Sequence, residues 1–164
     1  MDSVYFSAIG QDSHRFVQDA CSKPLMLGGV RIPDTPGLEG NSDADVILHA
    51  LCNAISGLSG VTVLGTATDR LCREQGITDS RVYVAEALAT LNGIRLIHAS
   101  ISVEARRPHL RRYIDPIRES IAGLLSLPVE RIGLTATTGE GLTSFGRGEG
   151  IQAFVIASAC RASE

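Results

Sequence analysis

The chain has 164 residues, with 15 Lys and Arg against 18 Asp and Glu, so its formal net charge is −3. A dedicated nucleic-acid-binding protein needs a concentrated basic surface, and this charge balance argues against that class. Hydrophobic residues make up 44% of the chain and charged residues 20%, and no stretch is long and apolar enough to span a bilayer. We therefore expect one soluble domain over residues 1–164, with no nucleic-acid and no membrane partner.

The N-terminus and the cysteines indicate the cell compartment. Residues 1–8 carry no basic segment of the kind that begins a secretory or transit signal. The four cysteines lie far apart, without the paired spacing of a zinc knuckle or a disulfide framework: Cys21, Cys52, Cys72 and Cys160. We expect reduced thiols and a cytoplasmic location.

The first third of the chain predicts a strand, a hairpin and a helix. Residues 4–9 form a β-branched and aromatic run that stops at Gly10, and residues 24–32 carry apolar side chains around two glycines. Residues 33–40 predict a loop. A helix should begin within residues 42–45, where oxygen-bearing side chains precede an apolar run.

The middle of the chain is harder to interpret, because glycine, threonine and serine alternate with single apolar residues over 57–76. We expect a flexible loop there, followed by a short helical turn near residues 69–74. Asp79 or Ser80 should cap the next helix, and Gly93 should end it. Residues 94–103 then alternate between apolar and polar side chains, as in a strand with one wet face.

The last third predicts a basic turn, a helix and two strands. The turn covers residues 106–109, and the helix covers about 110–125, with Asp115 and Pro116 as an alternative cap and first residue. The strands are predicted at 132–137 and 151–158, on either side of a glycine-rich run. This order of elements favours an α+β fold, with a mixed β-sheet and helices packed on one face.

Asp12, His14 and His49 are candidate metal ligands. Residues two apart in an extended chain point to the same side, so the Asp12 carboxylate and the His14 imidazole should converge. His49 shares one face of the predicted helix with Asp45 and Asn53. One carboxylate and two imidazoles leave a tetrahedral Zn²⁺ with an open position. The spacing alone equally fits histidines that serve only packing or surface hydrogen bonding.

A second candidate site follows the predicted strand 132–137. Thr137, Thr138 and the adjacent glycines offer hydroxyl and backbone N–H groups that could cradle phosphate oxygens. Glu140 would repel phosphate unless it holds a hard cation such as Mg²⁺ or Mn²⁺. A tight turn that needs glycine only for its backbone angles is the alternative. Arg147 and Glu149 could likewise form an ion pair or face solvent.

Several ordered segments together resemble the 2-C-methyl-D-erythritol 2,4-cyclodiphosphate synthase family of the non-mevalonate isoprenoid pathway. The resemblance covers nearly the whole chain. It rests on residues 11–14 (QDSH), 27–33 (LGGVRIP), 42–46 (SDADV) with 49–51 (HAL), 136–140 (ATTGE) and 146–151 (GRGEGI). It favours the metal interpretation of both candidate sites.

The resemblance implies roles for individual residues. Asp12, His14 and His49 match the ligands of Zn²⁺ or another divalent transition metal, and Glu140 matches the ligand of a second ion, Mg²⁺ or Mn²⁺. Substrate contacts are implied for a larger set: Asn41, Ser42, Ala105, Pro108, His109, Leu110, Thr137 and Thr138, of which Thr138 is also placed in the catalytic set. The residues from Ala105 to Leu110 form a cytosine-binding turn that the family lends to the neighbouring subunit.

The family also implies an assembly and a reaction. It forms a homotrimer with sites at the subunit interfaces, and Arg147 falls where members line an axial cavity that could hold an isoprenoid. The substrate, 4-diphosphocytidyl-2-C-methyl-D-erythritol 2-phosphate, would close into the cyclic diphosphate and release CMP. Asp45, one turn before His49, could orient a neighbouring group or assist the helix N-terminus as a surface carboxylate.

This chain departs from the family pattern at four places. Asn41 stands where members carry a histidine, Val63 stands where an aspartate grips the substrate diol, and His109 replaces a lysine. The axial aromatic residue shifts to Phe145. Two alternatives therefore remain besides the synthase: a non-catalytic trimeric protein that binds metal or isoprenoid, and a zinc phosphodiesterase that uses water.

Overall fold

Four strands form one mixed sheet in the computed structural model, which describes residues 3–19, 23–65 and 72–162. In spatial order they are β1 (Ser3–Arg15), β6 (Gly150–Ala162), β4 (Arg95–Glu104) and β5 (Ile132–Thr137). The pairs β1–β6 and β6–β4 are antiparallel, whereas β4–β5 is parallel. A separate hairpin joins β2 (Pro24–Leu27) to β3 (Val30–Pro36).

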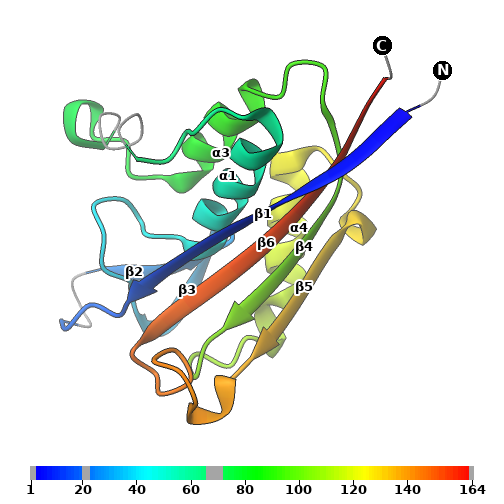
Figure 1. The fold of residues 1–164 in the computed structure, drawn as a ribbon. Coiled ribbons are helices and arrows are strands. Elements are labelled where there is room, and N and C mark those ends of the chain that lie inside the picture. Colours follow the sequence, from blue (N-terminus) through cyan, green and yellow to red (C-terminus); the bar gives the residue numbers. More distant parts are fainter. Residues whose placement is uncertain (1–2, 20–22, 66–71, 163–164) are drawn as a thin grey trace.

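Three helices cover one face of the sheet: α1 (Val46–Ser59), α3 (Ser80–Ala89) and α4 (Ile114–Leu125) (Figure 1). The structure also has three 3₁₀ turns, η1 (Arg111–Tyr113), η2 (Val129–Arg131) and η3 (Gly139–Gly141), and a helical turn over residues 72–75. The core lies between the sheet and α1, where Ile47, Leu51, Ile101 and Val155 are buried. The predicted α+β fold, with a mixed sheet and helices on one face, is confirmed.

The opposite face of the sheet carries exposed apolar side chains. Alternate residues of β1 and β6 point away from the helices, among them Tyr5 at 68%, Ile9 at 63% and Ile156 at 46% exposure. Ile9 lies directly opposite Ile156 across the two strands. Large apolar patches of this kind on a protein surface mark interaction sites.

Strand β1 was predicted to end at Gly10, which is wrong. It continues to Arg15 and pairs with β6 throughout. The reason is a close approach: a Cβ at position 10 would overlap Ala50 O and Ala54 N of α1. Gly10 therefore lets α1 lie against the sheet and does not end the strand. The extension carries Asp12 and His14, which lie within the strand and not after it.

Helix α1 begins at Val46, with Asp45 as its cap, slightly later than the predicted start. Asp45 is fully buried, and its carboxylate accepts hydrogen bonds from the backbone N–H groups of Ile47 and Leu48. The same carboxylate accepts bonds from Gly28 N at 2.8 Å and Gly29 N at 2.7 Å in the β2–β3 turn. Burial raises the pKa of Asp45, against the opposing effect of these N–H donors. Of the two roles considered for Asp45, that of a surface carboxylate is wrong about its position, because Asp45 assists the start of the helix from the interior.

Replacing Asp45 by alanine should lower the free energy of unfolding by about 2–4 kcal/mol, because it removes a helix cap and leaves buried N–H groups unpaired. Urea denaturation followed by circular dichroism measures this loss. Asp115→Ala is the matched control, because the Asp115 side chain is 77% exposed and forms a surface ion pair with Arg118, one turn away. That control should cost under about 0.5 kcal/mol, and an equal loss in both variants would contradict the buried bridge.

Several boundaries differ from the predictions. Strand β3 reaches into the predicted 33–40 loop, and β6 extends beyond 158 to Ala162. Helix α3 has Asp79 as its cap, as predicted, but it ends at Ala89, before Gly93. Helix α4 begins at Ile114 after the single turn η1, with Tyr113 and not Asp115 at the cap position.

Some predictions fall partly outside the described residues. The flexible loop predicted over 57–76 is wrong at its start, because helix α1 occupies 57–59. Of the helical turn predicted near 69–74, only residues 72–74 are described, and they lie within a helical turn over 72–75. Cys21 also lies outside. Cys52, Cys72 and Cys160 are free thiols, as expected. Within the described part of the chain, no helix combines the length and apolar character needed to cross a membrane.

Candidate functional site

Strand β1 and helix α1 bring three candidate ligands together. Asp12 and His14 are two positions apart on β1, so both side chains lie on the face of the sheet that the helices cover. His49 lies in the first turn of α1. Asp12 Oδ2 lies 3.0 Å from His14 Nε2 and 3.1 Å from His49 Nδ1. One ligand atom from each residue falls within 4.8 Å of the others. The convergence predicted for Asp12, His14 and His49 is therefore present.

This donor set fits a divalent transition metal. Ligands placed tetrahedrally at about 2.0–2.1 Å from Zn²⁺ lie about 3.3 Å from one another, close to the 3.0 and 3.1 Å that separate Asp12 Oδ2 from the two histidine nitrogens. His14 Nε2 is buried and makes no hydrogen bond of acceptable geometry. Burial raises the pKa of Asp12, but the two imidazoles close to its carboxylate, with the hydrogen bond to His49, outweigh burial and hold that pKa far below its ordinary value. The carboxylate is thus kept ionised, as a metal ligand must be.

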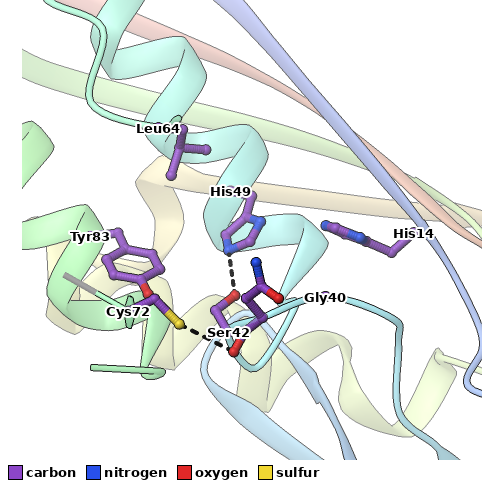
Figure 2. Close-up of a pocket in the computed structure, with 8 residues that line it drawn as sticks. His14, Gly40, Ser42, His49, Leu64, Cys72 and Tyr83 are labelled. Atoms are coloured by element: carbon purple, nitrogen blue, oxygen red, sulfur yellow. Dashed lines mark hydrogen bonds between the residues drawn. The ribbon is translucent and has the colours of Figure 1, made fainter. Parts of the chain in front are cut away.

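Polar and aromatic groups fix the ring of His49 from its other side. Its Nε2 lies 2.9 Å from Ser80 Oγ, at the start of α3, and 3.3 Å from Ser42 Oγ. The ring stands edge-on to His14 and faces Tyr83 at 6.1 Å between ring centroids. Figure 2 shows His49 between His14 and Tyr83, with Ser42 bonded to its ring.

A cavity of about 220 Å³ opens beside the two histidines. Its walls come from β1, the 40–42 loop, α1, the segment between α1 and α3, and α3 itself. The lining residues are His14, Gly40, Asn41, Ser42, His49, Leu64, Cys72 and Tyr83. Asn41 and Ser42, both predicted to contact substrate, therefore lie beside the candidate metal ligands His14 and His49. Cys72 donates its thiol hydrogen to Asn41 O at 3.2 Å, which holds this wall in place (Figure 2).

The remaining predicted substrate residues gather around a second cavity, of about 190 Å³. Strands β4 and β5 run parallel and end together, so the turn after β4 meets the turn after β5. Ala105 N donates to Thr137 O at 3.0 Å across this junction. The lining residues include all six predicted here: Ala105, Pro108, His109, Leu110, Thr137 and Thr138.

Glu140 lies in η3, just after this second cavity, with an exposed side chain and a left-handed backbone (φ 50°). Its Oε1 accepts a hydrogen bond from Thr138 Oγ1 at 3.1 Å. Among the described residues, Glu140 does not belong to the Asp12–His14–His49 cluster, and the two cavities share no lining residue. The described chain thus presents two separate candidate sites, one with the three possible metal ligands and one with the two turns and Glu140.

Comparison with known proteins shows the family to which the chain belongs. The sequence model described as the YgbB family matches residues 5–159. The 2-C-methyl-D-erythritol 2,4-cyclodiphosphate synthase of Chlamydia abortus is 46% identical over 154 residues, which cover 93% of this chain and 88% of the relative. The chain belongs to this synthase family. The resemblance found in the sequence is confirmed.

Solved structures of 2-C-methyl-D-erythritol 2,4-cyclodiphosphate synthases share the fold. One is 32% identical with a TM-score of 0.83, and the match covers 94% of this chain and 99% of the other. Another, described as the form bound to CDP, is 33% identical with a TM-score of 0.79 and the same coverage. The family's fold therefore extends over nearly the whole chain.

The departures from the family pattern occupy different environments. Asn41 lines the cavity beside His14 and His49, which we call the metal-side cavity. Val63 is buried, at 7% exposure, and its neighbour Leu64 lines that cavity instead. His109 lines the second cavity. Phe145 lines another hollow, together with His14, and Arg147 pairs with Glu149 at 2.9 Å within the chain.

The polar groups behind His49 were not predicted from the sequence. Ser80 was predicted only as a possible helix cap, and Asp43 and Tyr83 were given no role. Ser80 is 31 positions from His49 along the chain, so neither helical nor strand periodicity relates them. The one signal was indirect: Asp79 caps α3, which leaves the Ser80 side chain free to point elsewhere.

Proposed function

We propose that the protein converts 4-diphosphocytidyl-2-C-methyl-D-erythritol 2-phosphate to 2-C-methyl-D-erythritol 2,4-cyclodiphosphate with release of CMP. The observation that carries this proposal is the close cluster of Asp12, His14 and His49 at a cavity wall, in a chain whose relatives are named for that reaction. It is a phosphorus–oxygen lyase in the non-mevalonate isoprenoid pathway.

Asp12, His14 and His49 would hold Zn²⁺ or another divalent transition metal, and Glu140 would hold a second ion, Mg²⁺ or Mn²⁺. When bound, such ions polarise the phosphates and offset the charge that grows on the leaving CMP. The protein itself fixes the ligand geometry: β1 sets the spacing of Asp12 and His14, and the cap at Asp45 anchors the first turn that carries His49.

The substrate would span the two kinds of half-site. The cytidine end would occupy the cavity of the 105–110 turn, and the hydroxyls of Thr137 and Thr138 would contact phosphate oxygens. Asn41 and Ser42 would contact the phosphates beside the metal ligands. The CDP bound by the solved relative supports a cytidine diphosphate substrate.

No side chain has to act as a strong base in this proposal. The attacking group is the substrate's own 2-phosphate, which is already anionic, and it displaces CMP from the β-phosphorus. The contribution of the site is to fold the substrate so that the two phosphates meet, an effect worth up to about 7–11 kcal/mol in well-oriented systems. Thr138 is the residue of the second half-site best placed to orient the phosphate near Glu140.

We further propose a homotrimer in which one chain's metal-side cavity faces the next chain's 105–110 turn and Glu140. The exposed apolar face of β1 and β6, with Tyr5, Ile9 and Ile156, supports a surface buried between copies. Phe145 and Arg147 would then lie near the threefold axis, where a cavity could admit an isoprenoid. The three free thiols support the proposed cytoplasmic location.

Incubation of the purified protein with the diphosphocytidyl substrate, Zn²⁺ and Mg²⁺ tests the reaction. We expect CMP and the cyclic diphosphate, identified by ³¹P NMR and mass spectrometry. CMP with a linear diphosphate would instead indicate a hydrolase, and the absence of CMP would indicate a binding protein. Either result would overturn the proposed synthase.

A further inference from the structure

Glu104, the last residue of β4, reaches the glycine-rich loop that joins β5 to β6. Its Oε1 accepts a hydrogen bond from the hydroxyl of Thr143 in that loop. Thr143 Oγ1 in turn accepts a hydrogen bond from Gly146 N at 2.9 Å. This one hydroxyl therefore closes a turn inside the loop and fastens that turn to the end of the strand.

The loop packs on Glu104 so closely that only glycine fits at position 139. A Cβ there would overlap Glu104 Oε1 and would lie 3.0 Å from Gly146 Cα. Gly139 also has a left-handed backbone, with φ 69°, just before Glu140. The Glu104 carboxylate is thus held directly beside η3, the turn that carries Glu140.

A backbone bond fastens the same loop to the turn that follows β4. Arg106 N donates to Phe145 O at 3.2 Å, and each of these residues lies two positions beyond the Glu104–Thr143 bond. The 105–110 turn, proposed to hold the cytidine end, is therefore joined to the glycine-rich loop by one side-chain bond and one backbone bond.

The two partners of the side-chain bond stand outside the second cavity. The described residues that line this cavity include Thr137 and Thr138, but neither Glu104 nor Thr143. Glycine loses more conformational freedom on ordering than any other residue. The loop is rich in it, at Gly139, Gly141, Gly146 and Gly148. A loop of this composition needs ties to its surroundings to stay in one conformation.

We propose that Glu104 and Thr143 are positioning residues, which hold the glycine-rich loop against the 105–110 turn and so preorganise the second cavity for a cytidine nucleotide. The inference rests on the proposed function for the identity of that nucleotide. When the tie is lost, the nucleotide must order the loop as it binds, and this ordering lowers its affinity.

Two substitutions at Thr143 separate the hydroxyl from the shape of the side chain. Thr143→Val keeps the branched shape but loses both hydrogen bonds, whereas Thr143→Ser keeps the hydroxyl. Calorimetric titration with CDP in the presence of Mg²⁺ should give an affinity about tenfold lower in Thr143→Val, and within about twofold of the wild type in Thr143→Ser. Thr135→Val is the matched control with unchanged affinity, because Thr135 Oγ1 donates to Ile101 O within the sheet, at 3.4 Å.

The partner residue gives an independent check. Glu104→Gln keeps an oxygen that accepts from Thr143, whereas Glu104→Ala removes it and should weaken CDP binding as Thr143→Val does. Because both residues act through one bond, the double variant Glu104→Ala/Thr143→Val should bind CDP within about twofold of Thr143→Val alone. Without nucleotide, amide hydrogen exchange over residues 139–148 should be faster in both single variants, with α1 unchanged.

Several results would overturn the inference: unchanged CDP affinity or unchanged loop exchange in Thr143→Val, an equal loss in Thr143→Ser, additive losses in the double variant, or a wild type that does not bind CDP. If Thr143→Val does not fold, the comparison of Glu104→Ala with Glu104→Gln decides the matter. Failure of the proposed function is distinguishable, because a wild type that binds CDP but releases no CMP from the diphosphocytidyl substrate refutes the synthase and leaves this inference standing.

Discussion

His49→Ala should lose its transition metal and its synthase activity together, with kcat/KM falling by at least about a thousandfold, because the metal supplies several kcal/mol of charge stabilisation. The variant removes one of the three proposed ligands found among the described residues, and Asp12 and His14 on a single strand cannot enclose an ion alone. Metal content of the purified protein and CMP release measured on the same sample give the result.

The control is His98→Ala. His98 lies on β4 and is not part of the ligand cluster in the described chain, so its loss should leave metal content and CMP release near wild-type values. If His49→Ala lost the metal but kept its activity, the role assigned to the Asp12–His14–His49 cluster would be wrong. If it kept both, His49 would not be a ligand.

Two inactive variants should restore activity to each other when their subunits are mixed. His49→Ala disables only the metal-side cavity, and Glu140→Gln disables only the half-site that follows β5, where Glu140 lies. In a threefold ring where each site combines one half from each of two neighbours, an equal random mixture leaves about one quarter of the sites intact. CMP release after unfolding and reassembly together should therefore rise from near zero to about a quarter of the wild-type rate.

The matched control mixes His49→Ala with His14→Ala. Both lesions fall in the same half-site, so no combination of these chains contains an intact site, and the mixture should stay inactive. If His49→Ala and Glu140→Gln chains assemble together but remain inactive, the shared site at the subunit interface is refuted. Each variant alone keeps one of the two cavities intact. Inactivity of each variant alone would therefore show that neither cavity carries out the reaction without the other.

The sequence predicted the site best where neighbouring positions carry the geometry. Asp12 and His14 converge because alternate residues of a strand share a face, and this holds although the strand was predicted to end too early. The pairing of the 105–110 turn with Thr137 and Thr138 came from the family resemblance, and parallel β4 and β5 give its physical basis. The hairpin and both of these strands were predicted near their true positions.

The sequence failed where distant contacts override local patterns. A glycine after an apolar run predicts a strand end, but Gly10 stays in β1 because α1 packs on it too closely for any side chain. Asp45 looked like a surface residue, yet it is buried because the hairpin supplies two additional N–H donors. Ser80 bonds His49 only because α3 packs beside α1, and no spacing rule could relate residues that tertiary packing alone brings together.

The length of β1 has a practical consequence for studying the proposed assembly. Ser3 pairs with Ala162, so the two ends of the described chain emerge side by side (Figure 1). His14 lies at the other end of the same strand, about 36 Å away at the usual rise of an extended chain. Fluorescent dyes or purification tags attached to either end would sit far from the chemistry, so differently labelled subunits could be counted within one ring without disturbing the reaction.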